Sequence, residues 1–462
     1  MGLAASTLPY PDAHAQNEGA TSDHIFQSVS IGRLPEQFPQ LEAVLRKAAL
    51  QSPTMVRKQL EVAQQDASRF RGWWTYVPEV NMNYNIGVFH EIREGIDEDQ
   101  DTRVAAEYIL RADQPLYTWG AWTARRKLAF TREDIAEEDA FLTYATLVNE
   151  LRAAYLSLVS AKAEADLRAL RAQNAQRRVR EMESEAAQGR RRPMEVESSR
   201  LELQSRQLNA ERFALVLEQR FNEFRQISGA LEIELDSLPA LVEVPGFSIE
   251  DLESRLEAFR REGFGDSTPA KLAEHRQAAI GHELTIQRAR QKPLFNLGAA
   301  IRQGPEEGVD GDYELQTIFF AGITGTWNLF DRRETQDNIR SLRIRRRLVD
   351  AELAIERDRR VAAAENALAN LKIGRHSLDL QSRLVRARTE DLKQVQSRID
   401  QGQADEGERE AAIELLRESE LSLTKESARM LNAYYAFLGA LLEDPALAYY
   451  QDTPSFESRL AD

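Results

Sequence analysis

Residues 80–88 read Val-Asn-Met-Asn-Tyr-Asn-Ile-Gly-Val, and this stretch decides the fold class. Apolar and polar residues alternate with a period of two, which is the pattern of a β-strand with one apolar face. The other face carries asparagine and glycine, a composition that suits a wall with a wet interior and a lipid-facing exterior. A half-buried strand in any other protein gives the same alternation, so that alternative stays open.

Three further segments follow the same period. The strand around residue 84 is expected to span 77–90, and the others are expected at 103–117, 293–302 and 313–330. The alternating runs within them have about the 9–11 residues that a tilted strand needs to cross a bilayer. Four strands cannot close around a channel, and open edges in lipid leave backbone groups unpaired at a cost of several kcal/mol each. Strands in a membrane would therefore have to be pooled from several copies of the chain.

Aromatic residues gather where these strands begin and end. Such residues are typical of the interfacial girdle of a membrane protein. The alternative is that they cap the core of a soluble sheet. The residues are Trp73, Trp74, Tyr117, Trp119, Trp122, Trp327 and Phe330.

Very long helical segments follow each pair of strands. Residues 121–188 contain neither proline nor glycine, and residues 332–401 contain only Gly374. At about 1.5 Å per residue, each helix would be roughly 100 Å long. Glycine-containing turns and return helices predict two antiparallel hairpins. An a/d coiled-coil seam is indicated by the steps of three and four between Phe141, Tyr144, Val148, Leu151, Tyr155 and Leu158.

The two halves of the chain carry the same ordered marks, which indicates an internal duplication. Pro53 pairs with Pro269, Pro78 with Pro293, Gly189 with Gly402 and Gly229 with Gly439, and the four pairs have similar separations in the sequence. The expected first repeat is 34–229, with a hairpin at 121–229 and its tip at 189–193. The second is 268–442, with a hairpin at 331–442 and its tip at 401–408. Residues 230–267 and 443–462 are expected to be surface segments.

Residues 1–33 are expected to form a leader and an extended segment. Ala13-His14-Ala15 resembles the small-x-small site of a signal peptidase, although Met1 to Pro11 lacks a basic region. Residues 1–15 therefore read either as the remnant of a signal peptide or as a leader.

The composition excludes several classes of function. The net charge of −15 argues against a nucleic-acid partner, and the absence of cysteine excludes thiolate chemistry and disulfides. No run of about 18 apolar residues predicts a transmembrane helix. The sequence contains no P-loop, HExxH, GxSxG or Cys/His cluster. We therefore expect no catalytic residue, no cofactor and no metal site.

Taken together, these marks make the chain resemble the TolC-type outer membrane efflux and secretion channel family. The resemblance extends over about residues 34–442 and rests on an ordered set that occurs twice, not on any single motif. Pro78 stands before the first strand, and Gly189 and Gly402 stand at the hairpin tips. The set also includes Leu41-Glu-Ala-Val-Leu45 with Ser52-Pro53, Gln114-Pro-Leu-Tyr-Thr-Trp-Gly120 and Trp327-Asn-Leu-Phe-Asp331.

The resemblance implies an α+β membrane protein. Three protomers would each give four strands to one β-barrel, and long antiparallel helical hairpins would form a coiled-coil tunnel across the periplasm. The implied function is the outer membrane channel of a tripartite efflux or type I secretion system in a Gram-negative-type bacterium. The partners would be two further copies, a periplasmic adaptor, an inner-membrane transporter and outer membrane lipid. The alternative is a soluble periplasmic coiled-coil adaptor or scaffold, although two hairpins and two strand pairs fit an adaptor poorly.

The two tips differ in charge, and this difference leads to a hypothesis about gating and adaptor contact. Ion pairs between neighbouring hairpins could hold the tunnel shut, although each exposed pair contributes only ~0–1 kcal/mol. Glu408 matches one acidic position of the family's second tip, whereas Ala411 occupies another. Charges that merely solvate the turns are the alternative. The tip residues are Arg190, Arg191, Arg192, Asp400, Asp405, Glu406 and Glu408.

The segments 90–103 and 302–313 join strands on the side away from the helices. Their many acidic residues would form an acidic mouth in a trimer and could favour cations. Solvated loop charge is an equally good interpretation.

Overall fold

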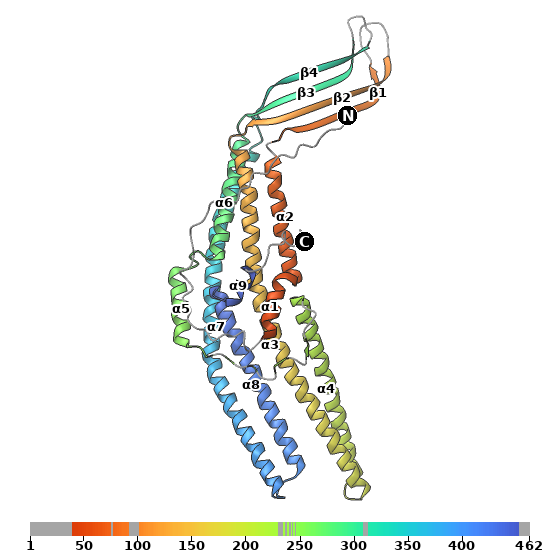
Figure 1. Ribbon diagram of the computed structural model, residues 1–462, viewed down its shortest axis with the longest axis vertical. Coiled ribbons are helices and arrows are strands. Elements are labelled where there is room, and N and C mark those ends of the chain that lie inside the picture. Colours follow the sequence, from red (N-terminus) through yellow and green to blue (C-terminus); the bar gives the residue numbers. More distant parts are fainter. Residues whose placement is uncertain are drawn as a thin grey trace, which may run out of the picture.

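The computed structural model is an elongated molecule with a sheet at one end and two helical tips at the other (Figure 1). The expected leader, most of the 90–103 loop and the end of the chain lie outside the described residues. None of the described helices has a stretch long and apolar enough to cross a membrane. The described residues are 39–74, 77–91, 101–229, 246–307 and 313–451, with single positions between 234 and 244.

The chain runs through two helices, two strands and a helical hairpin, and then repeats the strands and the hairpin. Short elements connect the two halves and follow the second hairpin. The elements are α1 (Pro39–Gln51), α2 (Pro53–Trp74), β1 (Glu79–Glu91), β2 (Asp101–Tyr117), α3 (Ala121–Ala187), α4 (Pro193–Ser228), α5 (Ile249–Glu262), α6 (Thr268–Ala289), β3 (Leu294–Glu307), β4 (Tyr313–Thr326), α7 (Glu334–Asp400), α8 (Glu406–Leu441), η3 (Pro445–Leu447) and α9 (Ala448–Gln451).

The sheet is an antiparallel meander in the order β1-β2-β3-β4. Directly opposed residues lie on the same face of an antiparallel pair. One row across all four strands is Met82, Leu110, Ile301 and Phe319. The alternation seen in the sequence therefore becomes one continuous apolar face.

Two strand boundaries differ from the expected ones. β3 continues to Glu307, beyond the expected end at residue 302, because its ladder with β4 is unbroken as far as Tyr313. β4 ends at Thr326 and not at residue 330, so Trp327 and Phe330 lie in the turn that leads into α7.

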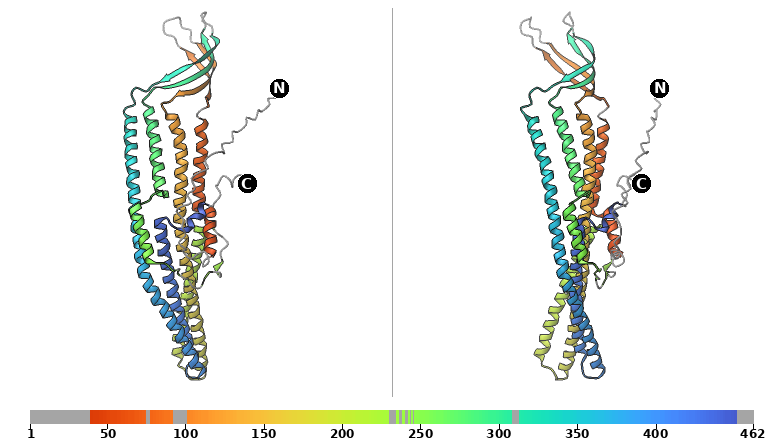
Figure 2. Two further views of the ribbon diagram at one scale, coloured as in Figure 1. Left: turned by 60° about the vertical axis from the view of Figure 1, so that its left-hand side comes forward. Right: turned by 90° about the vertical axis from the view of Figure 1, so that its left-hand side faces the viewer.

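Below the sheet, α2, α3, α6 and α7 stand side by side in one layer (Figure 2). α3 contacts both α2 and α6, and α6 in turn contacts α7. Further from the sheet, α3 pairs with α4 and α7 pairs with α8 as two hairpins. Each hairpin turns at a glycine with positive φ, which is 76° at Gly189 and 69° at Gly402.

The hydrophobic core sits at mid-height, where both hairpins meet α1 and the segments that connect and follow them. Tyr144, Leu151 and Leu158 of the expected seam are fully buried there, which confirms the heptad interpretation. Phe224 of α4 and Phe437 of α8 are also fully buried. The core therefore fastens the two repeats together at the middle of the molecule.

The apolar heptad positions of α4 are buried only near its end. Phe224 is fully buried, but Leu201, Leu208 and Leu215 are 60%, 67% and 60% exposed. These leucines recur at every seventh position, so they form a stripe that the described residues leave uncovered. We call this set the α4 stripe.

The duplication is more regular in the structure than in the sequence marks. α3 and α7 each have 67 residues, and α4 and α8 each have 36 residues. Gly229 directly follows α4 and Leu442 directly follows α8, with similar φ angles of 68° and 61°. The structural partner of Gly229 is therefore Leu442, and the sequence pairing of Gly229 with Gly439 was wrong.

Candidate functional site: sheet face, helix–strand junction and hairpin ends

The apolar face of the sheet is exposed in the single chain. Tyr84 and Ile86 of β1 are 70% and 72% exposed, and Phe319 and Ile323 of β4 are 74% and 67% exposed. A monomeric soluble protein rarely exposes so large a contiguous apolar patch. The face is therefore built for an apolar environment.

The opposite face of the sheet carries charges that pair across and along the strands. Arg302 on β3 donates to Glu107 on β2 at 2.7 Å, and Arg111 lies 2.7 Å from Asp113. Ile109 interrupts this polar face, as the sequence indicates, and Ile318 and Phe320 of β4 also lie on it. The two faces thus differ in chemistry, as the two sides of a lipid-to-water wall do.

Aromatic side chains lie where the strands meet the helices. The Trp119 indole donates to the carbonyl of Pro293 at 2.7 Å, and the Lys292 ammonium lies 4.5 Å from its ring centroid. The Tyr117 ring meets Trp119 edge to face with centroids 4.8 Å apart. Trp119 itself adopts a φ of 54°, a left-handed conformation that non-glycine residues rarely adopt.

The second repeat places a tryptophan in a similar position. The Trp327 indole donates to the carbonyl of Gln291 at 3.1 Å, and Phe330 is 79% exposed. Trp122 lies in the first turn of α3, where its backbone N–H donates to the Thr118 hydroxyl at 3.3 Å. Trp73 and Trp74 end α2, and their side chains lie outside the described part of the chain.

Asp331, at the end of the Trp327–Asp331 run, is a helix-capping residue. Its carboxylate accepts from the backbone N–H of Thr335 at 3.1 Å. Hydrogen bonding from the Thr335 side chain, assisted by this backbone N–H, lowers the pKa of Asp331 below its usual value. The run therefore ends the sheet and starts α7.

The two hairpin tips lie at the same end of the molecule (Figure 1). At the first tip, Arg191 lies 2.7 Å from Glu185 and 3.6 Å from Glu195, both on its own hairpin. Arg190 donates its backbone N–H to the carbonyl of Glu185, and Arg192 precedes the Pro193 that starts α4.

The acidic residues of the second tip also have partners within their hairpin. Asp405 caps α8 by accepting from the backbone N–H of Glu408 at 2.8 Å. The Glu408 carboxylate lies 3.0 Å from Arg398 of α7, and Glu406 pairs with Arg409. Asp400 accepts from the Gln396 amide at 3.1 Å. An ion pair between hairpins would compete with these contacts.

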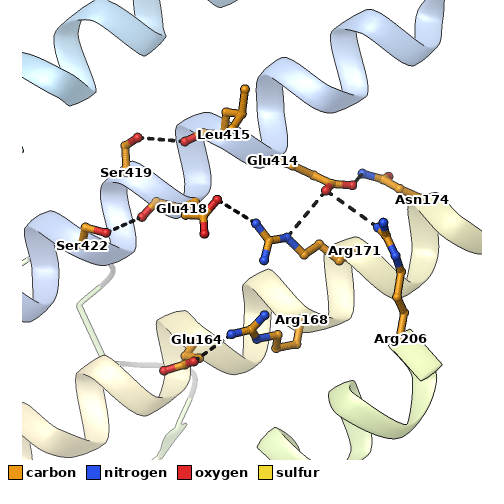
Figure 3. Close-up of polar contacts among 10 residues, drawn as sticks. All are labelled: Glu164, Arg168, Arg171, Asn174, Arg206, Glu414, Leu415, Glu418, Ser419 and Ser422. Carbon is orange, nitrogen blue, oxygen red and sulfur yellow. Dashed lines mark hydrogen bonds and ion pairs between the residues drawn. The ribbon is translucent and has the colours of Figure 1, made fainter. Parts of the chain in front are cut away.

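A ladder of polar contacts joins α3 to α8 between the core and the tips (Figure 3). Arg171 of α3 lies 2.9 Å from Glu418 and 3.6 Å from Glu414 of α8. Glu414 also accepts from the Asn174 amide at 2.8 Å, and Arg206 of α4 approaches it at 3.9 Å. We call these contacts, together with Glu164–Lys425 above them and Arg177–Glu410 below, the α3–α8 ladder.

Glu164 forms the rung next to the core. It lies 2.6 Å from Lys425 across the seam and 3.1 Å from Arg168 on its own helix. Burial by itself raises the pKa of Glu164, but the hydrogen bonds from Lys425 and Arg168 outweigh it and lower the pKa below its usual value. At the other end of the ladder, Arg177 lies 2.7 Å from the buried Glu410.

The sequence interpretation missed this ladder. Glu410, Glu414 and Glu418 recur at every fourth position. That spacing puts them on one side of α8. Arg171 and Arg177 are also near each other on α3. The sequence therefore showed charged residues on both helices, but it did not show that the two helices pack against each other.

The family model described as "Outer membrane efflux protein" matches residues 44–230. A search of curated proteins gives no match for the chain.

Solved structures share the fold over nearly the whole chain. The CmeC outer membrane channel of Campylobacter jejuni has 12% identity and a TM-score of 0.68, with 99% of this chain and 97% of that chain covered. The outer membrane protein VceC of Vibrio cholerae has 14% identity, a TM-score of 0.61, and coverage of 88% and 97%. The open-state MtrE outer membrane channel of Neisseria gonorrhoeae has 17% identity, a TM-score of 0.56, and coverage of 87% and 90%. The chain therefore has the fold of these outer membrane channels, and its residues 44–230 are similar to outer membrane efflux proteins.

Proposed function

We propose that three copies of this chain form the outer membrane exit duct of a tripartite efflux or type I secretion system. The sheets would pool into one barrel, and the hairpins would form a tunnel through the periplasm. Substrates would pass without any reaction on this protein. An inner-membrane transporter, coupled through a periplasmic adaptor, would supply them.

The exposed apolar face of the sheet is the observation that carries this proposal. β1 and β4 are the outer strands of the sheet, so each has one edge without a partner strand within the described part of the chain. An open edge in hydrocarbon costs several kcal/mol for each unpaired backbone group. Pairing β4 of one copy with β1 of the next removes both edges and keeps the apolar face outward. The similarity of residues 44–230 to outer membrane efflux proteins supports the same assembly.

Reconstitution into planar bilayers tests the channel. We expect discrete conductance steps from the purified trimer, and retention in the membrane fraction after carbonate washing. A soluble adaptor would instead be released by the wash and would be a monomer in mild detergent. That outcome would contradict the channel and favour the alternative.

We also propose that the tip charges hold the periplasmic end closed. Arg190 to Arg192 on one hairpin and the Asp405, Glu406 and Glu408 group on the other share one end of the molecule, so neighbouring hairpins in a trimer can exchange partners. Each exposed pair is worth only ~0–1 kcal/mol, so the three-fold repetition is what makes the closure significant. An adaptor that binds these charges would open the tunnel.

The test reverses the charge of two acidic residues at the second tip. The double variant Asp405→Lys and Glu408→Lys is expected to raise single-channel conductance, because it removes the acceptors for the arginine tip. Asp405→Ser is the matched control for capping, since serine still caps a helix but carries no charge. An unchanged conductance in the double variant would contradict the gating proposal without affecting the channel proposal.

A further inference from the structure

Cationic side chains gather at the helix ends next to the sheet, although the chain as a whole carries a net charge of −15. Residues 121–132, which begin α3, and residues 286–293, which end α6, contain no acidic residue. The members described here are exposed, and we call them the basic collar. They are Arg125, Lys127, Arg288, Arg290, Lys292, Arg332 and Arg333.

The collar lies at one level of the molecule. α3 begins at Ala121, α6 ends at Ala289 and α7 begins at Glu334, and all three ends meet the sheet. Each collar residue is within six positions of its helix end, which is about 10 Å or less along the axis. Within the same six positions the acidic residues are Glu283 on α6 and Asp331, Glu334 and Asp337 beside the start of α7. α3 and α6 therefore carry most of the excess positive charge.

Cations project from both faces of the helical layer. Arg125 and Lys127 are two positions apart on α3, so their side chains point about 200° apart around the axis. α2 and α6 cover the two sides of α3, which leaves the two faces of the layer for these cations. Arg288 and Arg290 stand in the same relation on α6. Whichever face is turned outward in the trimer, cations occupy it.

The collar also borders the aromatic residues of the junction. Lys292 lies 4.5 Å from the ring centroid of Trp119, and the Trp119 and Trp327 indoles are fixed by hydrogen bonds to the carbonyls of Pro293 and Gln291. Indole rings of this kind settle at the headgroup level of a bilayer. The tryptophans therefore place the cations beside the phosphates of the leaflet nearest the helices.

We propose that the basic collar binds anionic phospholipid headgroups of that leaflet and fixes the height of the protein in the membrane. This inference rests on the membrane placement proposed above. Each cation near an anionic surface contributes enough attraction for a roughly fivefold change in affinity at moderate salt. The arginine side chains can in addition donate two parallel hydrogen bonds to one phosphate.

The five tryptophans of the chain are the natural probe, because all of them lie at or next to the helix–strand junction. The full-length protein is reconstituted into bilayers that contain brominated phosphatidylglycerol or brominated phosphatidylcholine, and quenching of tryptophan fluorescence gives the relative affinity of each lipid. We expect preferential quenching by phosphatidylglycerol. One molar salt should weaken this preference, since the Debye length falls from about 10 Å to about 3 Å.

The collar variant is Arg125→Gln, Arg288→Gln and Arg290→Gln, none of which touches a tryptophan in any described contact. We expect the preference for phosphatidylglycerol to fall roughly fivefold for each removed cation that meets a headgroup. The matched control is Arg383→Gln, Arg386→Gln and Arg388→Gln, which removes the same charge from α7 roughly 70 Å or more from the junction. The control should keep the preference of the wild-type protein.

The quenching results distinguish a failure of the basic collar from a failure of the proposed membrane placement. Equal quenching by both lipids, or an equal loss of preference in the collar variant and the control, would overturn the collar alone. No quenching by either lipid would overturn the membrane placement, and the collar with it.

Discussion

At the scale of single residues, Gly229 shows how tightly the beginning and the end of the first repeat are fastened to each other. Its φ of 68° ends α4, and a Cβ at this position would run into the backbone carbonyl of Gln51. Ser52, in the break between α1 and α2, donates its hydroxyl to the carbonyl of Ile227 at 2.8 Å. The backbone between α1 and α2, at Ser52, and the end of α4 therefore form one close contact.

We predict that Gly229→Ala lowers the thermal midpoint of the detergent-solubilised protein more than Gly189→Ala does. Both glycines have left-handed φ angles, so both substitutions cost about 1–2 kcal/mol of backbone strain. Only Gly229 meets another backbone, because nothing lies within 4 Å of a Cβ at Gly189. Circular dichroism at a helical wavelength measures both midpoints, and equal losses would contradict the close-contact explanation.

A buried ion pair fastens the segment that follows α8 in a comparable way. Arg152 of α3 donates to Asp444 through both terminal nitrogens, and its guanidinium stacks 3.8 Å from the ring centroid of Tyr435. Both charged side chains are almost fully buried. Asp444 also accepts from the backbone N–H of Ala446 at 2.9 Å, so its second role is to start η3. Removing one partner of such a pair leaves an uncompensated buried charge.

At the scale of elements, the α3–α8 ladder replaces an apolar seam below the core. An apolar seam holds two helices at any pH, whereas a charged seam depends on ionised partners. Because the pKa of Glu164 is lowered in the folded state, its contribution is present above the unfolded value of about 4.5 and is lost as the pH falls through the folded value.

We therefore predict that acidification weakens the seam through Glu164. Glu164→Gln should lower the thermal midpoint at pH 7 by the equivalent of about 1 kcal/mol, and the variant should lose less stability than the wild-type protein between pH 5 and pH 3. Glu218→Gln, at an exposed position on α4, is the control and should follow the wild-type protein. A variant that keeps the full acid response would show that Glu164 is not the titrating group.

Much of the element structure could be predicted from the sequence, because its signals are local. The period of two around Tyr84 and the steps of three and four around Leu151 reflect which face each residue presents, and those faces are local geometry. The ladder was not predicted because Glu414 and Arg171 meet only once two distant helices are packed. Leu442 was missed as the partner of Gly229 because nothing in the sequence marks a leucine that adopts a left-handed φ.

At the scale of the whole molecule, the α4 stripe and the two sheet edges are surfaces that the described part of one chain leaves uncovered. They lie in different parts of the molecule, yet both would be buried by neighbouring copies around a three-fold axis. Burying a leucine side chain contributes about 1.5–3 kcal/mol relative to leaving it exposed. The stripe would therefore stabilise the helical part of the trimer independently of the sheet.

We predict that Leu201→Ser with Leu208→Ser lowers the temperature at which the detergent-solubilised trimer dissociates. Glu202→Ser with Asn209→Ser changes two exposed positions, each next to one of the leucines and about 100° around the helix, and should leave the trimer close to wild type. Size-exclusion chromatography with light scattering after stepwise heating measures both. A trimer that survives the leucine changes unaltered would place the contact between copies elsewhere.

The equal lengths of corresponding helices, 67 residues in α3 and α7 and 36 residues in α4 and α8, restrict how this protein can change in length during evolution. Deleting a single residue from one limb shortens that limb by about 1.5 Å and rotates every later side chain by about 100°. The tip would then no longer reach the level of its counterpart, and the buried seam would turn toward solvent. Tolerated insertions and deletions should therefore come in whole heptads, placed at matching depth in all four limbs.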